Sequence, residues 1–339
     1  MIFEAEFAPG LLSVARDEIR TVTGNKGRII KSYRDDALQF TFEGEIQHLL
    51  RLRTVIAIYA VVQFDVPRPK ALLGHQHLHR LLDTIRSLLS LDKYQSLYVS
   101  AAGSYSSVMM RIKSELCQHL GLVIGEDEGD LLLRMRRTPG AKQGWDVLIR
   151  LTPRPLATRD WRICNYEGAL NASVAAAMIH LTNPTPEDRF LNIACGSGTM
   201  LIERHQIMSA KVIIGCDNAL EILACAKENI KAAQIRGIDL NHADAIQSPL
   251  ASNSIDKLVA DLPFGHLVGS HEENEWLYPA IMTEAARVAR KNARFVLITH
   301  EIRLMEQLLS DYDDWNLVEK AIKITLSGLH PRIYILERK

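Results

Sequence analysis

Two short stretches of the chain hold residue types that could do chemistry. In residues 188–199, an apolar run ends in Gly196-Ser197-Gly198-Thr199, and in residues 258–265 another ends in Asp261-Leu262-Pro263-Phe264. Each predicts a buried strand that runs into a loop, and open parallel sheets bind ligands at the carboxyl ends of their strands. Glycines let backbone approach a ligand closely, whereas an acid, a proline and an aromatic ring suit a planar base that bears an amine.

A third strand is predicted between them, over 211–217, and it ends in Asp217, 21 residues after Gly196. That spacing is typical of a Rossmann-like unit that hydrogen-bonds a ribose, although Asp217 or Asn218 could also cap the helix predicted over 219–234. Asp244 follows a further predicted strand. A role in a turn and a contact with adenine are about equally expected for this residue. Dinucleotide enzymes have the motif Gly-x-Gly-x-x-Gly or Gly-x-Gly-x-x-Ala. In this chain Gly196 and Gly198 match its first two glycines, but Leu201 stands at its last position. The pattern therefore favours a nucleoside without a pyrophosphate, and S-adenosylmethionine is the expected cofactor.

The loop after the strand ending at Asp261 predicts methylation of an amine. An exocyclic amine on a purine is a poor nucleophile, because its lone pair is delocalised into the ring. A carboxylate and a backbone carbonyl can accept its two N–H bonds and turn the lone pair towards a methyl group. Pro263 fixes the loop backbone, and Phe264 offers a face on which a base can stack. A strand-end turn with a buried Phe is the alternative, but it does not account for the place of this turn in the sheet.

Other chemical patterns in the chain are weaker. In His75-Gln76-His77-Leu78-His79, positions i and i+4 could share a helix face with metal-ligand spacing. No Cys or acid supplies further ligands, so a polar helix start without metal is expected. Cys195 and Cys216 are expected to be packing residues, since neither has a base nearby in sequence. The five cysteines lack C-x-x-C spacing and are predicted to be reduced thiols of a cytosolic protein; they are Cys117, Cys164, Cys195, Cys216 and Cys225.

Composition limits the class of protein. With 339 residues and a formal net charge of zero, the chain is expected to hold two or three domains and is unlike a histone-like binder. No apolar run reaches the roughly 18 residues of a membrane helix, and the N-terminus lacks the basic region of a signal peptide. A cytoplasmic protein with no membrane partner is therefore predicted.

The predicted elements would position these motifs in three parts. Residues 1–66 show a β-α-β-β-α-β order that indicates a ferredoxin-like domain, followed by Pro67-Arg68-Pro69. A helix is predicted over 165–182, and the parallel strands end in an antiparallel pair over 315–326 and 332–337.

Residues 131–162 carry seven Arg and one Lys against two Asp, a net charge of +6. This excess of positive charge suits RNA phosphates, although a solvated hairpin is the alternative. The expected RNA-binding residues are Arg134, Arg136, Arg137, Arg154 and Arg159.

Taken together, these residues resemble the THUMP-domain class I RNA methyltransferases that make N2-methylguanosine in tRNA. The resemblance covers residues 1–66 as the ferredoxin-like domain, 70–155 as the THUMP domain and 161–339 as the Rossmann-fold methyltransferase domain, including Ala169-Leu170-Asn171 and Gly328-Leu329-His330-Pro331. It implies an α/β fold, S-adenosylmethionine as cofactor, and a monomer that has tRNA as its partner. It also implies that Asp217 holds the ribose and Asp244 the adenine. Asp261, Pro263 and Phe264 would form the catalytic loop that positions guanine.

The expected cofactor-binding residues lie in the helix start, the Gly-rich loop and the two strand ends that follow: Asn171, Asn192, Ala194, Gly196, Ser197, Gly198, Thr199, Asp217, Asn218, Asp244 and Ala245. Two of the motifs depart from the family pattern. Asn192 stands where an acid is usual, and Leu262 replaces the more frequent first proline, which favours guanine N2 over adenine N6. The alternatives are methylation of rRNA or of an adenine N6 amine, and a non-catalytic RNA-binding factor that retains the cofactor.

Overall fold

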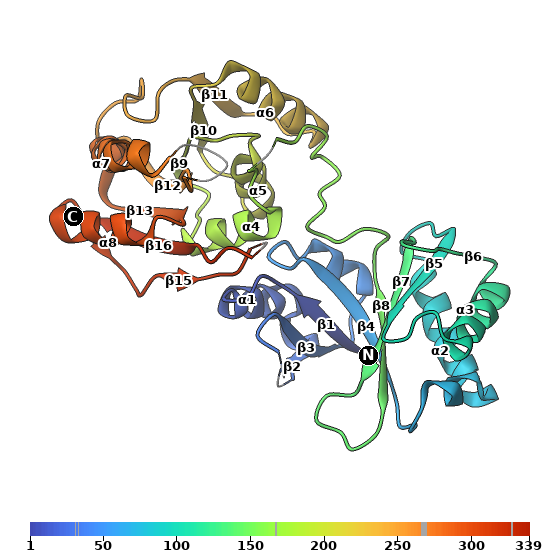
Figure 1. The fold of residues 1–339 in the computed structure, drawn as a ribbon. Helices are drawn as coiled ribbons and strands as arrows, with labels where there is room; N and C mark the ends of the chain where they lie inside the picture. Colours follow the sequence, from blue (N-terminus) through green and yellow to red (C-terminus); the bar gives the residue numbers. More distant parts are fainter. Residues whose placement is uncertain (31, 33, 167, 266–269, 327) are drawn as a thin grey trace. The chain divides into compact units, whose positions relative to one another are not determined.

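The computed structural model describes residues 1–30, 32, 34–166, 168–265, 270–326 and 328–339. The chain forms two compact units (Figure 1). The N-terminal unit comprises Met1–Phe7 and Ala15–Leu156, and the C-terminal unit comprises Ala8–Val14 and Ala157–Lys339. Among the helices described, none is long and apolar enough to cross a membrane.

The N-terminal unit is built on one eight-stranded sheet with the order β2-β3-β1-β4-β8-β7-β5-β6. On α2, Leu78, Leu82 and Ile85 recur at helical spacing and pack into the core of this unit. The strands are β1 (Ile2–Glu6), β2 (Gly27–Ile29), β3 (Ala37–Phe42), β4 (Ala57–Phe64), β5 (Ser96–Ala101), β6 (Val123–Ile124), β7 (Leu131–Arg137) and β8 (Trp145–Arg150). The helices are α1 (Leu12–Thr23), α2 (His75–Leu89) and α3 (Ser107–Leu120), with 3₁₀ turns at Gly24–Lys26, Ile46–Arg51 and Pro69–Leu73.

The C-terminal unit has a second eight-stranded sheet, with the order β11-β10-β9-β12-β13-β16-β14 and β15 paired to β16. Strands β9 to β13 run parallel, and β16 is antiparallel between β13 and β14. The strands are β9 (Arg189–Ile193), β10 (Val212–Asp217), β11 (Ile238–His242), β12 (Ile255–Asp261), β13 (Ala289–Thr299), β14 (Trp315–Leu317), β15 (Ile322–Lys323) and β16 (Arg332–Arg338). The helices are α4 (Ala172–Leu181), α5 (Thr199–Ile207), α6 (Leu220–Ala232), α7 (His271–Val288) and α8 (Ile302–Asp311).

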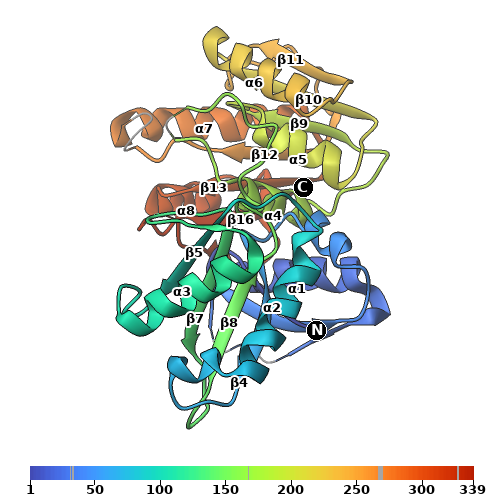
Figure 2. The same ribbon diagram turned by 90° about the vertical axis from the view of Figure 1, so that its right-hand side faces the viewer.

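Helices cover both faces of this second sheet (Figures 1 and 2). Leu258 and Ala260 of β12 pack in a cluster with α7 and α8, whereas Val259 packs in another with α4, α5 and α6. Successive side chains of a strand point to opposite faces, so β12 is buried on both. This burial explains why it is a continuous apolar run in the sequence.

The elements around the Gly-rich loop confirm the sequence predictions, since β9, β10, α5, α6 and β12 occupy the expected segments. The helix predicted over 165–182 begins only at Ala172, because Asn171 is its N-cap and its Oδ1 accepts a hydrogen bond from the Ser173 N–H at 2.9 Å. Position 167 of that prediction lies outside the described residues. The strand predicted over 315–326 is instead two short strands, β14 and β15.

Candidate active site

The loop between β9 and α5 brings bare backbone to the carboxyl end of the sheet. Ala194, Gly196 and Gly198 all have positive φ angles, of 49°, 55° and 79°. That conformation is unfavourable for Ala, and such strain is concentrated at functional sites. A Cβ at Gly196 would lie 2.3 Å from the Tyr166 Oη, and one at Gly198 would lie 3.2 Å from the Ala226 Cβ. No side chain fits at Gly196 without displacement of Tyr166.

Asp217 holds this loop from the end of β10. Its side chain is buried, its Oδ2 accepts the Gly196 N–H at 2.9 Å, and its Oδ1 accepts the Ala219 N–H at 3.1 Å. Ala219 is the N-cap position of α6. Asp217 therefore contacts both the Gly-rich loop and the start of α6.

A cavity of about 420 Å³ lies at the carboxyl ends of β10 and β12, within the usual size range of small-molecule sites. Asp217, Asp244 and Asp261 all line it, although they come from three different strand ends. The lining residues are Tyr166, Gly168, Ala194, Asp217, Asn218, Ala219, Ile222, Asp244, Ala245, Asp261, Leu262, Pro263, Phe264, Leu277, Ile281 and Leu329. The structure thus brings together both loops that the sequence singled out.

Asp261 lies at the end of β12, and its surroundings change its acidity. Burial raises the pKa of the Asp261 carboxyl to about 7, because the ionised form loses its hydration. Phe264 faces the His300 ring, with centroids 6.1 Å apart and planes 32° from parallel. The Asp261 carboxyl can accept a hydrogen bond from the amine of a planar base, and the Phe264 ring lines the same cavity.

Two buried residues of α7 hold the Asp261 loop, and sequence reasoning missed them. The Pro263 carbonyl accepts hydrogen bonds from Asn274 Nδ2 at 3.1 Å and from Tyr278 Oη at 2.6 Å. The Tyr278 hydroxyl also lies 2.7 Å from Thr299 Oγ1. Both α7 residues are fully buried, and their only signal in the sequence is a polar group on the apolar face of a helix. Their hydrogen bonds fix the direction of the loop that follows Asp261.

Tyr166 adds a hydroxyl donor to the cavity. Burial, together with the carboxylates of Asp261 and Asp217, raises the pKa of the Tyr166 phenol to about 12. The phenol consequently stays protonated at neutral pH. Its hydroxyl lies against Gly196 of the Gly-rich loop.

Six expected cofactor residues lie outside the lining of the cavity. Two of them, Gly196 and Gly198, are the loop glycines described above. Asn192 is buried, and its amide donates to the Ile193 and Val259 carbonyls at 3.1 and 3.4 Å, so it stays within the sheet. Asn171 caps α4 and is exposed. Ser197 and Thr199 are buried in the loop and at the first residue of α5, where their hydroxyl oxygens are 3.4 Å apart. Ser197 and Thr199 are therefore packing residues of the loop that do not line the cavity.

The cysteines agree only in part with prediction. Burial raises the pKa of Cys216 to about 11 and that of Cys195 still further, so both thiols are unreactive packing groups as expected. The prediction that all five are reduced thiols is wrong for two of them. Cys164 and Cys225 form a disulfide, because the fold brings their Cα atoms to 5.4 Å.

Three of the five arginines predicted to bind RNA are held by acids. Arg134 forms an ion pair with Glu6, and Arg136 donates to Glu4 at 2.9 Å. Arg159 is only 9% exposed and its Nε lies 2.8 Å from Glu203. The prediction that Arg159 lies on an exposed basic face is wrong, since it is buried within the C-terminal unit. Arg137, whose guanidinium lies 5.4 Å from the centre of the Trp145 ring, and Arg154 are exposed.

The histidines at 75, 77 and 79 begin α2, as predicted. His79 Nδ1 lies 2.8 Å from the His75 carbonyl, within one turn of the helix. Within the part of the chain that the structure describes, no group of three or more metal-binding side chains is found.

The sheet order, the Gly-rich loop after β9 and the acids at the ends of β10 and β12 define a Rossmann-like methyltransferase, a class that takes its methyl group from S-adenosylmethionine. The chain belongs to the family described as RMKL-like methyltransferase domain, which matches residues 159–331. Its fold is similar over the full length to the crystal structure of TrmN from Thermus thermophilus, with a TM-score of 0.78, 21% identity, and coverage of 100% of this chain and 99% of that one.

Curated relatives carry related names. The chain is 32% identical over 207 residues to tRNA (guanine(6)-N(2))-methyltransferase THUMP3 of Mus musculus, which covers 57% of this chain and 40% of the relative. It is 21% identical over 398 aligned residues to tRNA (guanine(6)-N2)-methyltransferase of Methanocaldococcus jannaschii, covering 99% of this chain and 100% of the relative. The chain thus spans about two fifths of the length of the mammalian protein.

Proposed function

We propose that this protein transfers a methyl group from S-adenosylmethionine to the N2 amine of a guanosine in tRNA. The observation that carries the proposal is that Asp217 and Asp261, at the ends of two parallel strands, line one cavity. Asp217 would bind a ribose, and Asp261 lies in a loop with the aromatic ring of Phe264. The names of the Mus musculus and Methanocaldococcus jannaschii relatives support guanine N2 as the target atom and tRNA as the substrate.

The residues present fit S-adenosylmethionine. Gly196 is packed so closely that a Cβ would meet Tyr166, which suits close approach of a ligand to backbone. Asp217 has two carboxylate oxygens at the strand end where a ribose diol binds in Rossmann-like sheets. Ile222 and Ala245 give the cavity apolar walls for a purine, and Asp244 lies in the turn beside Ala245. When bound, the cofactor supplies an electrophilic methyl group on a sulfonium centre.

The Asp261 loop would prepare the amine. Its carboxylate and a backbone carbonyl of the same loop accept the two N–H bonds and direct the nitrogen lone pair into the cavity. Positive charge grows on this nitrogen in the transition state, so the carboxylate stabilises the transition state more than the bound substrate. Phe264 stacks on the base, while Asn274 and Tyr278 keep the loop in place through the Pro263 carbonyl.

The N-terminal unit would capture the RNA. Strands β2, β3, β1 and β4 are neighbours in the antiparallel order of a ferredoxin-like domain, which supports the assignment of 1–66 to that domain. We assign 70–155 to a THUMP domain and 161–339 to the methyltransferase domain. A monomer of this kind would act on cytoplasmic tRNA, with exposed arginines such as Arg137 on phosphates and one nucleotide flipped into the cavity.

The deciding experiment is methyl transfer to unmodified tRNA under single-turnover conditions, followed by nucleoside mass spectrometry. We expect N2-methylguanosine, and turnover by Asp261→Ala should be lower by about 10²-fold or more. N6-methyladenosine as the product would refute the guanine assignment, and methylation of rRNA alone would refute the tRNA substrate. S-Adenosylmethionine binding without methyl transfer to any RNA would indicate a non-catalytic RNA-binding factor.

A further inference from the structure

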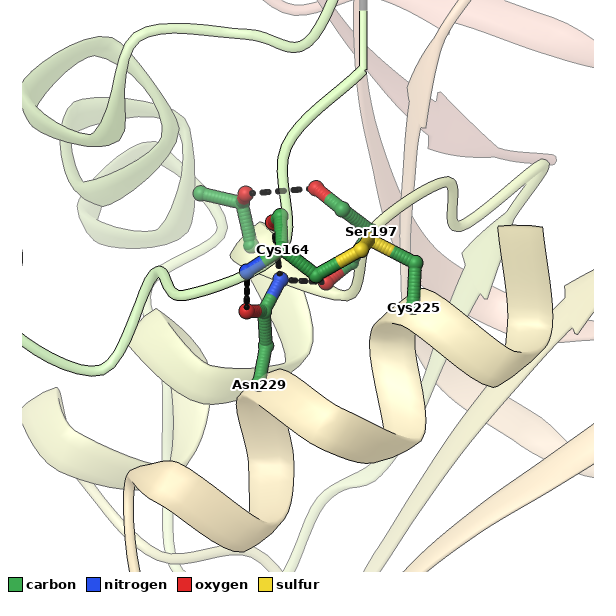
Figure 3. The surroundings of a disulfide bond; sticks show 5 residues. Cys164, Ser197, Cys225 and Asn229 are labelled. Carbon is green, nitrogen blue, oxygen red and sulfur yellow. Dashed lines mark hydrogen bonds between the residues drawn. A yellow bond between two sulfur atoms is a disulfide. The ribbon is translucent and has the colours of Figure 1, made fainter. Parts of the chain in front are cut away.

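The disulfide between Cys164 and Cys225 joins two segments next to the cavity (Figure 3). Cys164 precedes α4, and Cys225 lies on α6, whose first turn contributes Ile222 to the cavity. The two residues are 61 positions apart in sequence. The other three cysteines are free and buried.

A second link lies at the same junction. The Asn229 side chain, fully buried on α6, accepts the Cys164 N–H at 2.9 Å and donates to the Cys164 carbonyl at 2.8 Å. The same amide donates to the Ser197 carbonyl at 3.1 Å, as Figure 3 shows. One side chain therefore ties Cys164 to the Gly-rich loop. If the disulfide is reduced, the Asn229 side chain still links the Cys164 backbone to the Gly-rich loop.

The segment that starts at this junction lies along the cavity. We call the described residues of 162–170 the strap. Arg162 Nη2 donates to Thr199 Oγ1 at 2.6 Å and to the Leu170 carbonyl at 2.7 Å, so the strap folds back on itself at the start of α5. Between these contacts, Tyr166 and Gly168 line the cavity, and the Tyr166 hydroxyl lies against Gly196. A ligand that approaches Gly196 where a Cβ would point has to displace the Tyr166 hydroxyl.

We propose that Cys164 and Cys225 are a thiol–disulfide site that controls exchange of the cofactor. The disulfide holds the strap closed over the Gly-rich loop, and its reduction lets Tyr166 move away. This inference rests on the proposed cofactor site. Cys164 is half-buried and Cys225 is 7% exposed, so Cys164 is the sulfur that meets the oxidant first.

A peroxide is the class of oxidant proposed. Hydrogen peroxide transfers one oxygen to the Cys164 thiolate to give a sulfenic acid, its O–O bond breaks, and the hydroxide released takes up a proton to form water. The Cys225 thiolate then attacks this sulfur, the S–S bond forms as the S–O bond breaks, and a second hydroxide leaves and is protonated to water. Two electrons pass from the thiols to the peroxide. A dithiol reverses the reaction by two exchange steps and is itself oxidised to a disulfide.

The test measures release of tritiated S-adenosylhomocysteine from the full-length protein by filter binding after dilution into unlabelled ligand. Protein treated with hydrogen peroxide should release the ligand about tenfold more slowly than protein treated with dithiothreitol, because the strap has to open first. Peptide mass spectrometry without reductant should show the Cys164–Cys225 cross-link only after oxidation. Cys164→Ser should release ligand at the fast rate under both treatments, whereas Cys117→Ser, in the other unit, should behave as wild type.

Equal release rates in oxidised and reduced wild-type protein would overturn the inference, and so would failure of the cross-link to form. The wild-type comparison needs no variant, so it decides the question even if Cys164→Ser does not fold. Absence of S-adenosylhomocysteine binding in both redox states would refute the proposed cofactor site itself.

Discussion

Replacement of Asp261 by Asn should stabilise the protein in a way that depends on pH. The carboxyl has an ordinary pKa of 3.8, and burial raises its pKa to about 7 in the folded chain. Below pH 3.8 the group is protonated in both states and costs nothing. Between pH 3.8 and pH 7 the unfolded chain releases this proton, whereas the folded chain keeps it. The free energy of unfolding therefore falls as the pH rises through this range. Above pH 7 the cost is constant, at about 4 kcal/mol for three pKa units.

Asn cannot ionise, so the variant avoids this cost. By the same linkage, its free energy of unfolding should exceed that of wild type by about 2 kcal/mol at pH 5 and about 4 kcal/mol at pH 8. Urea titrations at the two pH values measure the difference between variant and wild type. Asp244→Asn, which removes an exposed acid from the same cavity, is the matched control. An Asp261→Asn effect that is equal at pH 5 and pH 8 would show that the Asp261 pKa is not raised, and the reasoning would fail.

Three further outcomes are expected. Asp217→Ala should weaken S-adenosylmethionine binding by about 1–3 kcal/mol, since a hydrogen bond to a charged group is lost. Unchanged affinity in calorimetry would leave Asp217 only structural contacts, with the Gly196 N–H and with the start of α6. Tyr278→Phe should destabilise the protein by about 1–3 kcal/mol. It should also lower kcat with little change in the KM for S-adenosylmethionine. A variant with the wild-type kcat would contradict the positioning role of Tyr278. Arg137→Ala should reduce the slope of log tRNA affinity against log salt by about one. Arg159→Ala should leave this slope unchanged and destabilise the protein, because the buried Glu203 loses its ion pair with Arg159.

Local sequence was sufficient for the elements that carry the site. Strands β9, β10 and β12 are buried on both faces, so they are continuous apolar runs that end at Gly, Asp or Pro. The order of these elements places their carboxyl ends at one edge of a parallel sheet. For that reason the sequence alone assigns Asp217 and Asp261 to one site, and both line the same cavity in the fold.

What sequence alone could not provide depends on contacts between segments far apart in the chain. Arg159 looked like part of a basic surface because its neighbours in sequence are basic, but Glu203, 44 residues later, pairs with it inside the C-terminal unit. Cys164 and Cys225 have no motif spacing, and only the packing of α6 brings them within bonding distance. Tyr278 meets the Pro263 carbonyl for the same reason. Spacing along a helix or strand sets which side chains share a face, whereas the partner that each buried polar group finds is decided by tertiary packing.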